Sequence, residues 1–198
     1  MLKRLLGLGI LFTLALYSWD QRREIAQPDG PIAPAAPRQT DMRDAPSHDL
    51  KGYRMTPLAR ISLEARVLGH ERYYFDRPSD LSSIDLALGW GPMSANQVLE
   101  RIKIYQSGRY YFWQAPRLPI PGREISRHSA NMHMIPSSNQ IARALKRVRR
   151  GQVVQLSGYL VKIEAPDGWQ WRSSLSRKDT GNGSCEVVYV KDFRIRDS

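Results

Sequence analysis

The chain has 198 residues, enough for one ordinary domain with accessory segments, so we expect a single hydrophobic core. Hydrophobic residues make up 41% of the sequence and charged residues 25%, which excludes a chain that is disordered throughout. There are 30 Lys and Arg against 19 Asp and Glu, and the net charge of +11 favours anionic partners such as phospholipid headgroups, envelope polymers or nucleic acid. The single cysteine, Cys185, excludes an intramolecular disulfide.

The first predicted element is a membrane segment. Lys3 and Arg4 precede an apolar run over residues 5–19, and charged residues follow the run at once. A helix of that length rises only about 22 Å, so the run also suits a cleaved signal peptide. However, it ends in bulky residues where a cleavage site needs small ones, and its Tyr17 and Trp19 suit a membrane interface. The sequence therefore predicts residues 1–24 as a single-pass anchor in a bacterial inner membrane, with the domain on the periplasmic side.

Residues 25–52 are rich in proline and poor in large apolar side chains. Such a segment buries too little surface to fold by itself, and its prolines favour a semi-extended conformation. We therefore expect a proline-rich linker that holds the domain away from the bilayer, with a proline-rich ligand for another protein as the alternative. A single β-rich globular domain is expected over residues 53–198.

Most of that domain has the pattern of β-strands. Residues 60–68 alternate strictly between apolar and polar side chains, as a half-buried strand requires. An aromatic strand is predicted at 109–114 and a long β-branched strand at 153–164. A Pro-Asp-Gly turn then leads into 169–175, which predicts a hairpin, and residues 185–195 supply the last strand.

Helices are fewer. Ser138 suits the N-cap of a helix in which Ile141, Leu145 and Val148 form one apolar stripe and which a glycine ends. The segment 95–103 fits either a helix or a strand. We therefore expect an α+β fold that is mainly β: a small coiled sheet or an OB-like or sortase-like β-barrel with one or two helices.

Two kinds of side chain mark a candidate binding surface. Basic residues cluster in and after the last turn of the predicted helix, and aromatic residues alternate with basic ones on the predicted strands. Surfaces that stack bases or sugars have this composition. A solvated basic face and aromatic core packing are the alternatives that stay open. The candidate binding residues are Arg143, Lys146, Arg147, Arg149, Arg150, Trp169 and Trp171.

The segment 119–138 is predicted as a loop and holds His128 and His133. Histidine changes charge near neutral pH and is the commonest metal ligand, so two of them within a few positions suggest catalysis or metal binding. No third ligand follows at a spacing typical of metal sites. The sequence therefore predicts no metal and no cofactor.

The order of His128 or His133, then Cys185, then Arg194 or Arg196 resembles the sortase family. That resemblance implies an anchored β-barrel in which a His, a Cys and an Arg cleave a sorting signal and transpeptidate through a thioester. The alternative is an inert core cysteine, because Cys185 shares one face of its predicted strand with apolar residues.

Residues 86–94 (LALGWGPMS), 128–136 (HSANMHMIP) and 169–190 resemble a family of conserved hypothetical proteobacterial proteins with an N-terminal hydrophobic segment. The resemblance implies a bacterial, membrane-linked setting and transfers no functional residue. We therefore expect a non-enzymatic envelope protein whose domain binds a protein or an anionic polymer. The alternatives are a sortase-like cysteine transpeptidase or hydrolase, and single-stranded nucleic-acid binding if the domain is cytoplasmic. Nucleic acid is not an expected partner in the periplasm.

Overall fold

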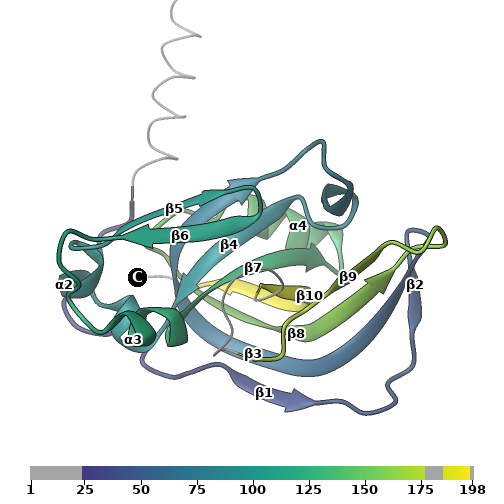
Figure 1. Cartoon of the computed structure of the whole chain (residues 1–198), viewed down its shortest axis with the longest axis horizontal. Helices are drawn as coiled ribbons and strands as arrows, with labels where there is room; N and C mark the ends of the chain where they lie inside the picture. The colour runs from purple at the N-terminus through teal and green to yellow at the C-terminus, as the bar shows by residue number, and fades with distance from the viewer. Residues whose placement is uncertain (1–23, 177–184, 197–198) are drawn as a thin grey trace, which may run out of the picture.

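A computed structural model describes residues 24–176 and 185–196, and its centre is a ring of five strands (Figure 1). These strands are β3 (Tyr53–Arg72), β4 (Ile84–Gly89), β7 (Ser129–Pro136), β8 (Val153–Glu164) and β10 (Glu186–Ile195). β3 pairs with β4, β4 with β7, β7 with β10, β10 with β8, and β8 with β3, so the hydrogen bonding returns to its starting strand. Only the β7–β10 pair within this ring is parallel. The predicted α+β, mainly β class is confirmed.

β3 closes the ring because its 20 residues are enough to pair with two other strands of the ring, β8 and β4. Its longer first part pairs with β8 and its end pairs with β4. Register shifts between Pro57 and Ala59 and between Val67 and Gly69 allow the strand to bend around the ring. The inward-facing residues Ile61, Leu63, Ala65 and Val67 are buried in the main core, which confirms the predicted alternation as far as Ala65. Arg66 is buried as well, so the half-buried pattern ends there.

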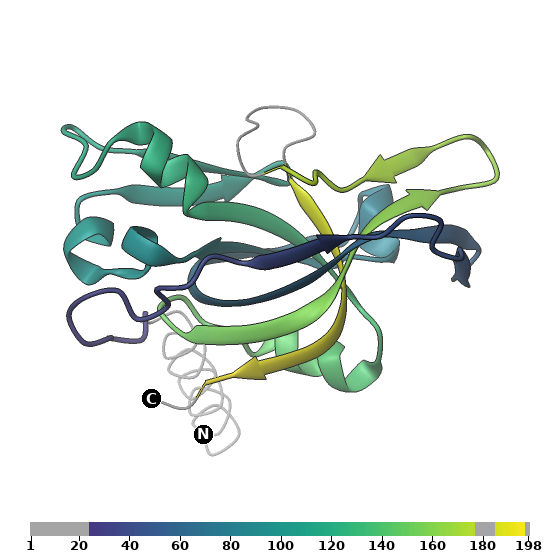
Figure 2. The same cartoon turned by 90° about the horizontal axis from the view of Figure 1, so that it is seen from below.

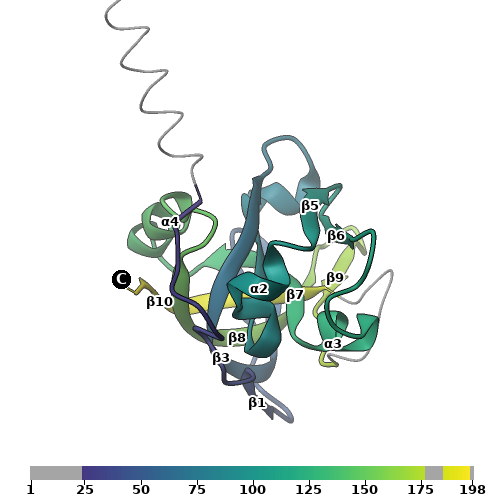
Figure 3. The same ribbon diagram turned by 90° about the vertical axis from the view of Figure 1, so that its left-hand side faces the viewer.

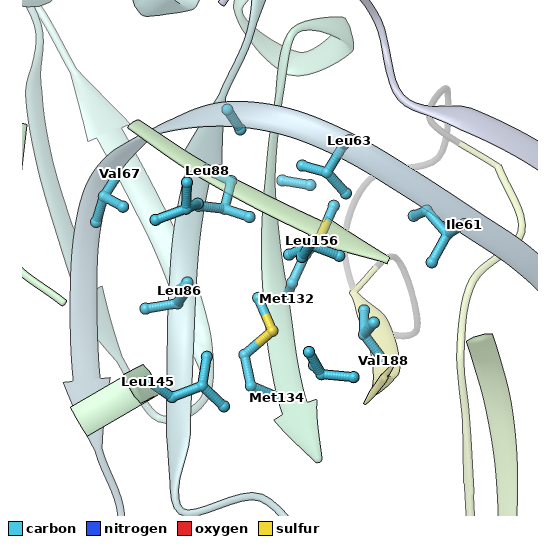
Figure 4. Packing of buried hydrophobic residues seen from close by; sticks show 14 of the residues in the cluster. Ile61, Leu63, Val67, Leu86, Leu88, Met132, Met134, Leu145, Leu156 and Val188 are labelled. Carbon is cyan, nitrogen blue, oxygen red and sulfur yellow. The ribbon is translucent and has the colours of Figure 1, made fainter. Parts of the chain in front are cut away.

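Apolar side chains from all five strands fill the ring, and α4 (Asn139–Lys146) packs against them (Figure 4). The Ser138 side chain caps this helix by accepting a hydrogen bond from Ile141 N at 3.3 Å. The predicted helix and its apolar stripe are therefore confirmed. Labelled members of this core are Ile61, Leu63, Val67, Leu86, Leu88, Met132, Met134, Leu145, Leu156 and Val188.

An inserted layer lies between β4 and β7 in the chain. It consists of η2 (Gly91–Ser94), α2 (Asn96–Leu99), the antiparallel strands β5 (Lys103–Ser107) and β6 (Tyr110–Gln114), and α3 (Gly122–Arg127). A second apolar cluster joins this layer to Leu68 and Ala87 of the ring. The predicted aromatic strand is β6, whereas residues 95–103 form the short α2 and then lead into β5.

The loop predicted at 119–138 is wrong, because this segment contains α3 and all of β7. β7 is buried along almost its whole length. Its polar side chains resemble those of a loop, but they face the inserted layer: Tyr111 contacts Ser129 and Gln106 donates to Asn131. Because the inserted layer covers the polar side chains of β7, neither face of this strand is exposed to solvent. Its sequence therefore lacks the alternation of apolar and exposed polar residues by which a strand is recognised.

Residues 24–52 differ from the spacer that their prolines predict. Ile25 N donates to Arg150 O at 2.8 Å, and Gly91 N donates to the carbonyl of the fully buried Ala33 at 2.8 Å. β1 (Arg38–Asp41) and β2 (His48–Leu50) then both pair with β3. Backbone hydrogen bonds therefore fasten this segment to the domain. The predicted membrane segment at 5–19 lies outside the described residues, and within 24–176 and 185–196 no helix has the length and apolarity to cross a bilayer.

The predicted hairpin at 153–175 is confirmed: β8 turns at Gly168 (φ +90°) into β9 (Gln170–Arg172), and Figure 2 shows it extending past the ring. η1 (Arg77–Asp80), between β3 and β4, lies beside this turn, with Arg77 Nη1 2.8 Å from Asp167 Oδ2. In β10 a bulge between Val190 and Asp192 reverses which face the following residues take. The single apolar face predicted for 185–195 is therefore wrong, because Val187 and Tyr189 belong to a separate cluster, whereas Phe193 and Ile195, beyond the bulge, pack against the main core.

Candidate anion-binding groove

An open groove of about 1690 Å³ lies where α4 and the turn after it meet the end of β3 and the last residues of β10. We call it the basic groove, because most of the charged side chains that line it are positive. The acidic residues along it are Glu71 and Asp192. The basic residues are Arg72, Lys146, Arg147, Arg149, Lys191 and Arg194.

The amphipathic character of α4 places its charges in this groove. Ile141 and Leu145 are buried in the core, so the basic side of the helix faces outward. Arg72 Nη2 donates to the carbonyl of Lys146 at 2.6 Å and so satisfies a backbone oxygen at the end of the helix. Positive side chains at a helix C-terminus are favoured by the helix dipole, which helps to hold this cluster together without an anion.

The electrostatics of the basic groove are unbalanced. Its acidic residues are too few to neutralise the basic ones, and Asp192 also accepts a hydrogen bond from Ser157 at 3.0 Å. Burial, followed by the charge of Arg72, lowers the pKa of His70 at one end of the groove. His70 is therefore neutral at pH 7, and the positive potential comes from the lysine and arginine side chains alone.

Three predicted binding residues, Lys146, Arg147 and Arg149, line the basic groove. Arg143 lies on α4 and is exposed outside the lining, and Arg150 pairs with Glu24 through Nε at 3.1 Å. The sequence gives no signal for Arg72 or Lys191, which come from strands distant in the chain. Trp169 and Trp171 are not part of the groove.

The two tryptophans, one in β9 and one just before it, belong to a row of aromatic side chains. The ring of Trp169 is 5.9 Å from that of Tyr53 and 6.2 Å from that of Trp171, which in turn is 4.8 Å from His133. The guanidinium of Arg77 lies 4.8 Å above Trp169. These contacts stabilise the β8–β9 hairpin against the ring, so the structure does not bring the predicted basic and aromatic residues together.

Arg109, at the β5–β6 turn with φ +70°, forms a second charged cluster inside the protein. Its Nη1 lies 3.0 Å from Oδ1 of the fully buried Asp85, and its Nε and Nη2 contact the two oxygens of Asp76 at 2.6 and 2.8 Å. The hydrogen bond from Arg109 is the main cause that lowers the pKa of Asp76. The guanidinium also covers the ring of Tyr73, and burial raises the pKa of this tyrosine to about 12. Arg109 thus fastens the inserted hairpin to the ring.

His133 lies beside this cluster and is buried with it. Its Nδ1 is 2.9 Å from Asp85 Oδ2, a contact at ion-pair distance whose angle does not form a hydrogen bond. A histidine–carboxylate pair is typical of general bases, but the two side chains are only 4% and 0% exposed. A substrate would therefore have to displace the side chains packed against the pair, Trp171 on His133 and Arg109 on Asp85, to reach it. His128 instead ends α3, with Nδ1 2.9 Å from Glu124 O.

The proposed sortase-like residues are divided between the two ends of β10. Cys185 is half-buried before its start, with Sγ 3.8 Å from Arg109 O. Arg194 and Arg196 lie at the other end, roughly 30 Å further along the strand. Arg194 lines the basic groove and Arg196 pairs with Glu64 at 3.0 Å. A sortase-like reaction requires an arginine beside the cysteine. The structure brings neither of the two predicted arginines to Cys185.

Within the part of the chain that the structure describes, no group of three or more His, Cys, Asp or Glu side chains is placed to hold a metal ion. No protein-family model matches the chain, and no curated protein or solved structure matches it either. The function is therefore argued from the fold and the chemistry of the basic groove.

Proposed function

We propose that this chain is a non-enzymatic binding domain that holds a polyanion in the basic groove. The observation that supports this proposal is the convergence of six basic side chains from three separate parts of the chain on one open surface. Positive charges held at fixed positions repel one another, and a polyanion relieves several of these repulsions at once. It also releases its own condensed counterions, which adds to the affinity.

The size and composition of the basic groove favour a polymer or an extended surface over a small ligand or a base-stacked strand. Its volume of about 1690 Å³ exceeds the roughly 300–1,000 Å³ that is typical of small-molecule pockets. Phe193 is the one Phe, Tyr or Trp among its lining residues, and His70 at the groove adds a single imidazole ring. Recognition of single-stranded nucleic acid uses several aromatic platforms, so charge is the feature this groove offers.

The strand pairing supports an OB-like barrel. Numbered in chain order, the ring strands pair as first with second, second with third, third with fifth, fifth with fourth, and fourth with first, and α4 lies between the third and fourth. OB folds bind their ligands on the face of the second and third strands. Here the inserted layer covers that face through Arg109, Gln106 and Tyr111. Because that face is covered, we place ligand binding on another surface of the ring, the basic groove.

The same proposal includes the setting predicted by the sequence. Residues 1–24 anchor the chain in a bacterial inner membrane, and the domain lies in the periplasm. Fusions of a phosphatase or a fluorescent protein after Ser198 test the orientation. An active phosphatase fusion supports it, and a fusion that is active only in the cytoplasm contradicts it.

The binding proposal is tested by titrating the full chain in detergent with fluorescently labelled inorganic polyphosphate. A groove variant carries Lys146→Gln, Arg147→Gln and Arg194→Gln. We expect its affinity to fall about a hundredfold at low salt, roughly fivefold for each charge removed. An unchanged affinity contradicts the proposal.

A control variant removes the same three charges elsewhere. Arg101, Lys103 and Arg117 are exposed on the inserted layer and lie outside the basic groove. Their replacement by Gln lowers the net charge by the same amount. If the control variant loses as much affinity as the groove variant, the binding follows net charge and not the basic groove.

A further inference from the structure

The first described residues are fastened to the turn between α4 and β8. Ile25 N donates to Arg150 O at 2.8 Å, while Glu24 contacts Arg150 at 3.1 Å and the buried Arg66 at 3.3 Å. Gly151 in this turn has φ +89°, and a Cβ there would collide with the backbone of Ile25. Backbone hydrogen bonding, ion pairing and close packing therefore all fix the point at which the chain enters the domain.

The same turn forms one side of the basic groove. Arg149 and Gln152 lie on either side of Arg150 and Gly151, and both line the groove. α4, which supplies further lining residues, leads directly into this turn. The basic groove therefore lies next to residue 24.

The predicted membrane segment ends close to this point. Trp19 closes the apolar run, five residues before Glu24. Five residues span at most about 17 Å, even when fully extended. A free spacer over residues 25–52 would have allowed the domain to move away, but these residues are fastened to it. A bilayer that holds residues 5–19 must therefore lie beside residue 24 and the groove.

We infer that the polyanion recognised by the basic groove is the anionic headgroup layer of the bilayer that holds the N-terminal segment. This inference rests on the proposed function and names its partner. Exposed basic side chains are attracted to anionic headgroups within about 10 Å, the screening length at 0.1 M salt. Five of the six basic residues of the groove are exposed: Arg72, Lys146, Arg147, Lys191 and Arg194. The domain is thus oriented on the membrane surface, with α4 and the end of β10 toward the lipid.

The test places a nitroxide label on the full chain in lipid nanodiscs. The label is attached to Gln140→Cys, an exposed position on the groove, in a Cys185→Ser background. A second label at Thr40→Cys reports from β1, which Figures 1 and 3 place at the opposite end of the molecule from residue 24. The measurement is the collision rate of each label with a water-soluble nickel complex, in discs of phosphatidylcholine alone or mixed with phosphatidylglycerol.

We expect the collision rate at position 140 to fall several-fold when phosphatidylglycerol is present, and the rate at position 40 to stay the same. The groove variant should lose this protection, and the control variant should keep it. Equal rates at position 140 in both kinds of disc, with polyphosphate binding intact, overturn the lipid inference and leave the proposed function standing. Loss of both effects overturns both proposals. A full chain that does not insert into either disc also overturns the inference.

Discussion

Replacing Arg109 by methionine is the most informative test of how the inserted layer is held. The substitution keeps much of the side-chain volume and removes the guanidinium that contacts Asp85 and Asp76. Asp85 is fully buried, so its carboxylate loses its hydrogen-bonded partner without gaining water. His133 Nδ1 stays at ion-pair distance but without hydrogen-bond geometry.

The expected cost is large because a fully buried carboxylate loses the guanidinium that donates a hydrogen bond to it. Removing one partner of such a pair destabilises a protein by about 3–5 kcal/mol. The measurement is the free energy of unfolding of the full chain in mild detergent, from urea titration. In the double variant Arg109→Met, Asp85→Asn the buried charge is absent, so the loss should be clearly smaller than in Arg109→Met alone.

An exposed ion pair provides the control. Arg77 and Asp167 are 2.8 Å apart at their closest atoms, close to the 3.0 Å between Arg109 and Asp85, but both lie at the surface, so Arg77→Met should change stability little. A loss in Arg109→Met that is no greater than that of Arg77→Met would refute the reasoning, and so would a double variant as unstable as the single one.

Three further predictions concern separate parts of the molecule. Gly151→Ala should cost about 1–3 kcal/mol in urea unfolding, because it combines positive φ with a collision against Ile25; an unchanged midpoint would contradict the fastened N-terminal segment. Burial lowers the pKa of His70 below its ordinary 6.5, so as the pH falls the imidazole of the unfolded chain is protonated before that of the folded chain. The free energy of unfolding should therefore decrease as the pH falls below 6.5. His70→Gln should remove that part of the decrease, and an identical pH profile would exclude it. Cys185→Ser should leave polyphosphate affinity unchanged, because Cys185 lies outside the basic groove; a loss of binding would point to a role for this thiol.

Local sequence patterns predicted the elements that have one buried face, a helix cap or a turn residue within their own few positions. The strand at 60–68 has one buried face, α4 has a cap and an apolar stripe, and the turn at Gly168 needs a positive φ. β4 and β7 escaped prediction as strands because both of their faces are covered, and the polar faces are covered by a segment inserted between them. Their polar side chains contact residues of the inserted layer, and a pattern of neighbouring residues in the sequence cannot predict such contacts.

The basic groove was predictable only in part for the same reason. Lys146, Arg147 and Arg149, at the end of α4 and in the turn after it, form a run in the sequence, so this cluster could be recognised. Arg72 and Lys191 reach the groove from other strands, and the pairing of the ring brings them there. The prolines of residues 25–52 predict an extended spacer, but the hydrogen bonds from Ile25 N to Arg150 O and from Gly91 N to Ala33 O join backbone atoms and leave no trace in the sequence.

The salt dependence of polyphosphate binding tests the central claim most directly. Each phosphate contact that is neutralised by Lys or Arg adds about one unit to the slope of log affinity against log salt concentration. The account predicts that the slope becomes shallower by about two to three units in the groove variant, and that the control variant keeps the slope of the unchanged chain. Equal slopes in all three proteins would contradict the claim that the basic groove holds the polyanion.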